Sequence, residues 1–141
     1  AGTFRGNQLA MKAGTVLLKK VSQPEFLKDV CKKGDLIRAR LNELKNKVSI
    51  IGDIRGVGLM VGTEFVNPKG QRDLQGSLPA SGEIAAKVQK MCFENYLVAE
   101  KGGRDGSVMR CLCALNISEE DVNKALDIFE KCVLEIDKEY K

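Results

Sequence analysis

One arginine near the C-terminus stands inside a run of apolar residues. The stretch GSVMRCLCALNISEED, residues 106–121, has the composition of a β-strand around Arg110. Burying a guanidinium without a partner is strongly unfavourable, and the planar fork of arginine suits a carboxylate held by two hydrogen bonds. Arg110 is therefore expected to bind an anion. Composition alone favours an ion pair with a nearby Asp or Glu, or an edge-strand arginine reaching solvent, over a ligand carboxylate.

A second candidate anion site opens the sequence. GTFRGN, residues 2–7, is a glycine-bounded turn ahead of a helical pattern. The hydroxyl of Thr3 and the backbone N–H groups of such a turn can bind a phosphate. The alternative is that Thr3 has a structural role alone and only caps the turn. A third candidate, Arg55, precedes a glycine-rich stretch and is more typical of a surface or interface residue.

Several kinds of site are disfavoured by the residue types. The sequence has five cysteines, no histidine and no CxxC pair, so a metal site is not expected and reduced cytoplasmic thiols are the simplest interpretation. Cys111 and Cys113 form a CxC on one strand face, which is typical of small buried apolar residues. The glycines of RGVGLMVG follow a GxGxxxG spacing inside a predicted strand, so they do not form a dinucleotide fingerprint.

The charge and hydropathy patterns limit the partners. A net charge of +4 arises from 23 basic and 19 acidic residues that are scattered along the chain. This distribution predicts a solvated surface and no nucleic-acid interface. No apolar run reaches the length of a membrane span, and no signal-peptide pattern opens the chain, so we expect no membrane association and a cytoplasmic location.

The elements that must position Arg110 follow from periodicity. Apolar residues at helical spacing predict helices over 7–21, from about 22 to 47, after Ser81 and after Ser118. Alternation predicts one strand from Val57 to Phe65, a short strand in NYLVAE (95–100) and a strand over 107–115, the last two joined by the turn KGGRDG. The order predicts an α+β fold in which helices cover a small, mostly antiparallel sheet.

Three stretches resemble one known family. GTFRGNQLAMKAG, IGDIRGVGLMVGTEFV and the segment from AAKVQKMCF to IFEKCV are similar, in order and spacing, to the class III (fold type I) pyridoxal-phosphate-dependent aminotransferases. The likeness covers nearly all 141 residues. It implies that residues 1–21 end a large cofactor-binding domain and that residues 22–141 form the C-terminal small domain.

The same resemblance implies roles for two residues. Thr3 would bind the phosphate of pyridoxal 5'-phosphate across a homodimer interface, and Arg110 would bind the substrate carboxylate. The implied reaction moves an amino group from diaminobutyrate, or a similar ω-amine, to 2-oxoglutarate and forms glutamate. Where the family has a proline pair after the arginine, this chain has Cys113 and Ala114, which puts the pose of Arg110 in question. An Arg110 locked onto an internal Asp or Glu, or turned away from where the large domain would dock, would overturn the ligand role.

The lysine that the family attaches to the cofactor matches no residue of this chain. We therefore expect no catalytic residue here, and a C-terminal fragment that is inactive alone. The alternative is a non-catalytic amino-acid-binding or oligomerisation module derived from that domain.

Overall fold

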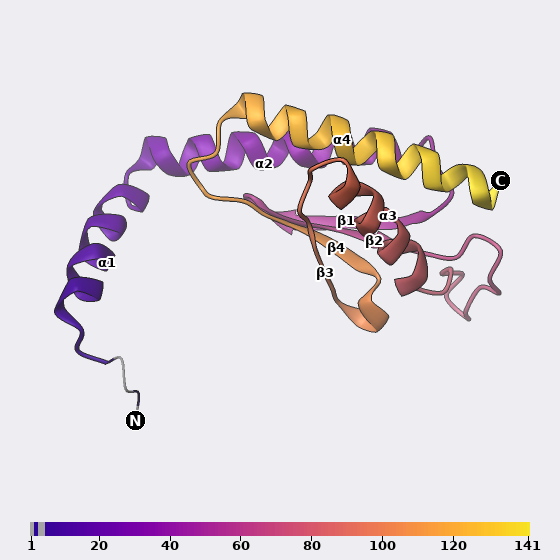
Figure 1. Ribbon diagram of the computed structural model, residues 1–141, viewed down its shortest axis with the longest axis horizontal. Coiled ribbons are helices and arrows are strands. Elements are labelled where there is room, and N and C mark those ends of the chain that lie inside the picture. Colours follow the sequence, from indigo (N-terminus) through magenta and orange to yellow (C-terminus); the bar gives the residue numbers. More distant parts are fainter. Residues whose placement is uncertain (1, 3–4) are drawn as a thin grey trace.

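The computed structural model describes residue 2 and residues 5–141 of the chain (Figure 1). Two helices open the chain, and a four-stranded antiparallel sheet in the order β1-β2-β4-β3 follows. The elements are α1 (Gln8–Val21), α2 (Pro24–Lys45), β1 (Ile51–Val57), β2 (Met60–Phe65), α3 (Gly82–Glu94), β3 (Glu100–Gly102), β4 (Val108–Leu112) and α4 (Glu119–Asp137). Short 3₁₀ helices span Arg104–Gly106 and Lys138–Tyr140. The predicted α+β fold is confirmed.

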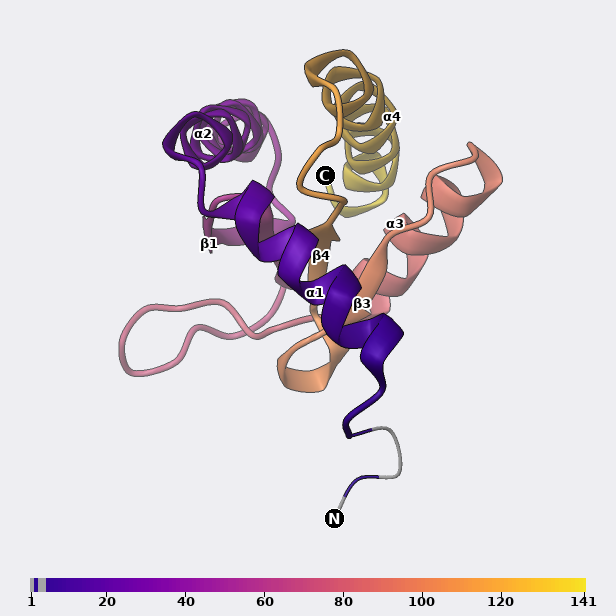
Figure 2. The same ribbon diagram turned by 90° about the vertical axis from the view of Figure 1, so that its left-hand side faces the viewer.

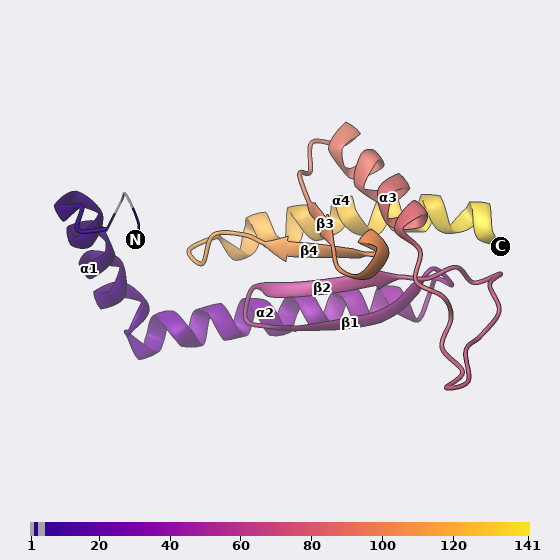
Figure 3. The ribbon, with the colours of Figure 1, turned by 90° about the horizontal axis from the view of Figure 1, so that it is seen from below.

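The molecule has two layers. Helices α2, α3 and α4 lie on one side of the sheet, and no helix of the described chain covers the other side (Figures 2 and 3). Alternate strand residues point into the helix layer, where Val61, Phe65 and Met109 are almost completely buried. The core lies between the two layers. The neighbouring strand positions therefore face the uncovered side of the sheet, which we call the open face.

The helix ends follow from local chemistry. Asn7 accepts a hydrogen bond from the backbone N–H of Ala10 at the start of α1, and Pro24 occupies the first turn of α2. Ser81 and Ser118 cap α3 and α4 through their hydroxyl oxygens, as predicted. Helices α1 and α2 begin and end within about two residues of the expected positions, and α3 and α4 begin directly after their predicted caps.

The predicted strand from Val57 to Phe65 is wrong at its beginning. The chain reverses at Gly58, which has φ 53°, and β1 and β2 form a hairpin in which Val57 pairs with Met60. This reversal puts Val57 on the open face with 81% of its surface exposed, whereas Val61 is 1% exposed. The predicted strand ran through the turn because apolar residues occupy every second position across it.

Two other strand predictions require correction. In NYLVAE only the last residue, Glu100, belongs to β3, because Tyr96 adopts a positive φ of 65° and the chain enters the sheet after Ala99. The strand predicted over 107–115 ends at Leu112. The predicted hairpin around KGGRDG is confirmed, since β3 and β4 pair antiparallel.

Helix α1 projects away from the rest of the molecule (Figures 1 and 3). None of its residues is buried, and its apolar side chains are widely exposed: Leu9, Met11, Val16, Leu17 and Leu18 are each 58–83% exposed. Within the described residues, no helix is both long and apolar enough to cross a membrane.

Candidate functional site

Arg110 lies on the open face, in the middle of β4. Its neighbours across the sheet are Gly62 on β2 and Glu100 on β3. The side chain is 39% exposed, and the apolar residues that flank it in sequence, Met109 and Cys111, face the helix layer instead. The pleat therefore explains how an arginine fits within an apolar strand, because its guanidinium does not enter the core.

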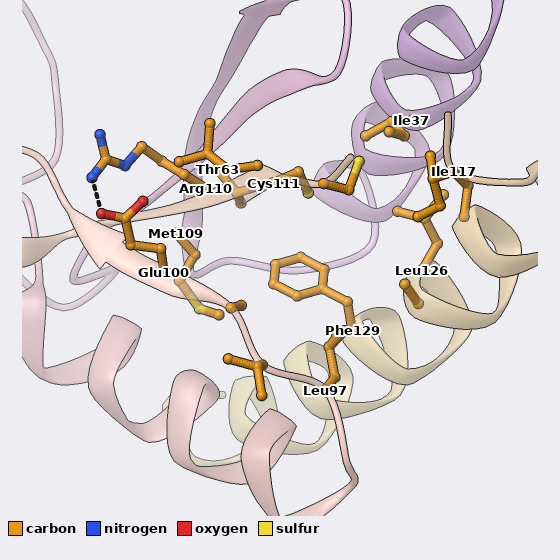
Figure 4. A pocket seen from close by; sticks show the side chains of 16 residues that line it. Ile37, Thr63, Leu97, Glu100, Met109, Arg110, Cys111, Ile117, Leu126 and Phe129 are labelled. Carbon is orange, nitrogen blue, oxygen red and sulfur yellow. Dashed lines mark hydrogen bonds and ion pairs between the residues drawn. The ribbon is translucent and has the colours of Figure 1, made fainter. Parts of the chain in front are cut away.

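Arg110 forms an ion pair with Glu100. Its Nη2 atom donates a hydrogen bond of 2.6 Å to Oε1 of the glutamate on the neighbouring strand (Figure 4). Arg110 thus has an internal carboxylate as its partner, which is the arrangement that composition alone favoured, and its role toward a ligand carboxylate stays a prediction. The two side chains are 39% and 51% exposed. An ion pair this exposed contributes only about 0.2–1 kcal/mol to stability, so the pairing is readily exchanged.

Part of the guanidinium lacks a hydrogen-bond acceptor. Nε of Arg110 is buried and has no partner among the described residues. Glu100 contacts Nη2 alone, and so the pair is monodentate. A buried donor without a partner is costly, and it marks a place where a further acceptor would be favourable.

A second arginine on the same face provides a comparison. Arg55 on β1 lies opposite Gly62, on the other side of β2 from Arg110. Its Nη1 contacts both Asp53, at 2.8 Å, and Glu64, at 2.5 Å. Hydrogen bonds to these carboxylates raise the pKa of Arg55, and the hydrogen bond from Arg55 lowers the pKa of Asp53. Arg55 is thus compensated by two negative charges, whereas Arg110 has one.

The loop that follows β4 is held by a buried lysine. Nζ of Lys33, on α2, donates to the carbonyl oxygens of Ile117 at 2.8 Å and Leu115 at 3.5 Å, and it pairs with Asp29 at 2.6 Å. Lys33 is only 3% exposed, and its ammonium is therefore buried among these three oxygen partners. These contacts hold the chain just after Cys113, where the proline pair of the resembling family is missing.

An apolar cavity of about 330 Å³ lies on the helix side of β4 (Figure 4). Leu97, Met109, Cys111, Leu126 and Phe129 are among its lining residues. Arg110 and Glu100 lie at one margin, with their charged groups directed away from Phe129 and Leu126 (Figure 4). The cavity is therefore apolar, and it lies on the opposite side of the sheet from the charged groups of the open face.

The CxC cysteines are only partly buried rather than fully inward as expected. Burial raises the pKa of the Cys111 thiol to about 11 and also raises that of Cys113. Both are therefore thiols at neutral pH and are poor nucleophiles. The described part of the chain contains no cluster of three or more side chains suited to a metal ion.

The other predicted site residue, Thr3, lies outside the described residues.

The sequence did not single out Glu100. The five residues between Gly102 and Val108 place Glu100 directly opposite Arg110. Counting outward from the turn in KGGRDG gives this pair once the loop length is known.

Comparison with known proteins agrees on one family. A family model described as aminotransferase class-III matches residues 1–133. The chain is 39% identical over 134 residues to a diaminobutyrate–2-oxoglutarate aminotransferase from Haemophilus influenzae, with 95% of the chain and 30% of that protein aligned. It is 40% identical over 124 residues to the protein of the same name from Rhizobium meliloti, with 88% of the chain and 26% of that protein aligned.

A solved structure supports the fold. A transaminase from the marine bacterium Virgibacillus superposes on the whole of this chain with a TM-score of 0.82 at 19% identity, and the chain covers 31% of it. The chain therefore spans less than a third of the length of these sequence relatives and of this structural relative.

Proposed function

Because the chain belongs to the aminotransferase class-III family, we propose that it acts as the C-terminal small-domain part of an aminotransferase in which Arg110 binds the carboxylate of the amino acceptor. The observation that carries the proposal is the guanidinium of Arg110. It lies on the open face, it is paired with one exposed carboxylate, and its Nε has no acceptor in the described part of the chain, residue 2 and residues 5–141.

The ion pair with Glu100 is compatible with this role because the pair is weak and exposed. A substrate carboxylate that forms two charge-assisted hydrogen bonds with the guanidinium would replace the single bond that Glu100 makes. The neighbouring arginine, Arg55, is a poorer candidate because Asp53 and Glu64 already compensate its charge. When no substrate is bound, Glu100 takes the place of the substrate carboxylate and keeps the Arg110 charge paired.

We also propose a specific reaction and specific partners for the complete enzyme. The amino group passes from diaminobutyrate or a similar ω-amine to 2-oxoglutarate, in a cytoplasmic homodimer. When bound, pyridoxal 5'-phosphate supplies the carbonyl group that carries the amino group between the two substrates. Residues 1–21 belong to the end of the large domain, and Thr3 is assigned to the cofactor phosphate. Support comes from the names of the relatives with 39–40% identity.

The test uses the complete aminotransferase that carries this segment. Arg110→Ala is expected to raise the KM for 2-oxoglutarate by about 10- to 100-fold, the equivalent of losing a charged hydrogen bond. Glu100→Gln removes the competing charge and is expected to leave the KM unchanged or lower it. Arg55→Ala is the matched control, since it removes an arginine from the same face, and its KM is expected to stay within about threefold of the parent.

Two results would contradict the proposal. One is an unchanged KM for 2-oxoglutarate in Arg110→Ala. The other is an equal increase in Arg110→Ala and Arg55→Ala, which would mean that the face responds only to lost positive charge. Absorbance of the bound cofactor, measured in each variant, separates lost substrate binding from lost cofactor binding.

A further inference from the structure

A glycine on β3 forms the surface on which the Arg110 guanidinium rests. A methyl group built on Gly102 would lie 3.0 Å from Nη2 of Arg110, 3.4 Å from its Cζ and 3.6 Å from its Nε. Residues 100 and 102 share one strand face, so Glu100 and Gly102 both lie beside Arg110 on the open face. The glutamate contacts the end of the guanidinium, and the guanidinium lies close to the backbone of Gly102.

The backbone conformation gives no other reason for glycine at this position. In KGGRDG the positive φ values belong to Gly103, at 73°, Asp105, at 54°, and Gly106, at 66°. Gly102 has no positive φ and pairs with Val108 as an ordinary strand residue. Glycine is unfavourable inside a strand unless another group must approach closely, and here that group is the guanidinium.

We propose that Gly102 is a positioning residue that holds the Arg110 guanidinium flat against β3 and so sets how a substrate carboxylate meets it. This inference rests on the function proposed for Arg110. A methyl group at position 102 would meet Nη2 at 3.0 Å, so a guanidinium that is already tied to Glu100 would have to shift outward from the sheet by a few tenths of an ångström, and a larger side chain would displace it further. The tilt changes the direction of the N–H groups without removing any charge.

The experiment compares two substitutions at this position in the complete aminotransferase. Gly102→Ala is expected to raise the KM for 2-oxoglutarate by about threefold, and Gly102→Val by about 10-fold or more, because a misplacement of about 1 Å can cost about 100-fold and alanine requires a smaller shift than valine. The kcat at saturating 2-oxoglutarate should stay within about twofold. The urea midpoint should not fall, because alanine and valine are favoured over glycine in a strand.

Lys101→Ala is the matched control. It changes the adjacent residue, which pairs with Met109 and lies on the opposite strand face from Gly102 and Arg110. Its KM should equal that of the parent. A combination of raised KM, retained kcat and retained stability is the pattern expected when residue 102 acts through the pose of Arg110.

The outcomes separate the two proposals. If Arg110→Ala raises the KM but both Gly102 variants match the parent, the positioning role is overturned and the proposed function stands. If none of these variants changes the KM, both are overturned. If the Gly102 variants lose stability and kcat together, Gly102 has a structural role and the inference is wrong; the alanine variant decides this where valine does not fold.

Discussion

Gly34 allows α2 to contact the turn between β1 and β2, and we predict that Gly34→Ala destabilises the chain. The residue lies within α2 and is buried. A methyl group there would lie 2.2 Å from the carbonyl oxygen of Gly58, 2.6 Å from its carbonyl carbon and 2.9 Å from its Cα. All three atoms belong to the backbone, so a side-chain rotation cannot relieve the overlap.

Two opposing effects set the size of the change. Helix propensity favours alanine over glycine by about 1 kcal/mol. Overpacking a well-packed site costs about 1–3 kcal/mol. Because the shortest contact would be more than 1 Å below the ordinary contact distance of 3.4 Å, the cost lies in the upper part of that range. The net loss is therefore about 1–2 kcal/mol, which would lower the urea midpoint by roughly 0.5–1 M.

Urea unfolding followed by circular dichroism measures this change. Gly14→Ala in α1 is the control, because a methyl group there meets no atom within 4 Å and its φ is not positive. Propensity alone then applies, and the control should be as stable as the parent or slightly more stable. A midpoint for Gly34→Ala equal to or above that of the parent would refute the steric argument.

Two further substitutions test buried charges. Lys33→Met removes the ammonium that binds the carbonyl oxygens of Leu115 and Ile117, and it should cost about 1–3 kcal/mol in urea unfolding. Asp137 is fully buried, and this burial acts to raise the pKa of its carboxyl group. Hydrogen bonds from Ser49 and the ammonium of Lys141 outweigh that effect, so the pKa of Asp137 is lowered overall. The charged form therefore stabilises the fold above the unfolded pKa of about 4, and this contribution is lost as the pH falls through the folded pKa. Asp137→Asn should be less stable than the parent at pH 7, and the difference should shrink in unfolding measurements below about pH 4; a pH-independent difference would contradict this.

The helices could be predicted because their signals are local. Pro24 and Ser118 mark helix starts through chemistry that acts within one turn. The β1–β2 hairpin could not be predicted in the same way. A two-residue turn reverses which residues face the core, and an uninterrupted apolar pattern hides that reversal: Val57 and Val61 look equivalent in sequence, yet only Val61 is buried.

The site was predictable to the level of one residue. The apolar strand identified Arg110, and the structure gives it an internal carboxylate as partner, while its role toward a substrate carboxylate stays a prediction. Prediction of its partner Glu100 would have needed the register of β3 against β4. Prediction of the part played by Gly102 would have needed the position of the Arg110 side chain. Lys33 resembled its neighbouring surface lysines, because the carbonyl groups that bury it come from a loop more than 80 residues away.

If Arg110 exchanges Glu100 for a substrate carboxylate as we propose, the contacts of α2 would keep the fold undisturbed. Lys33 holds the loop after β4, and Gly34 contacts the turn before β2. Because Met60 pairs with Leu112, both contacts fix the same end of the sheet. At the other end the backbone N–H of Phe65 donates a hydrogen bond to the backbone carbonyl oxygen of Ser107, a residue that is fully buried. The backbone of β4 is thus held at both ends, while the charged end of Arg110 rests on an exposed ion pair. A carboxylate that replaces Glu100 needs to move only two side chains, and little of its binding energy is lost to reorganisation.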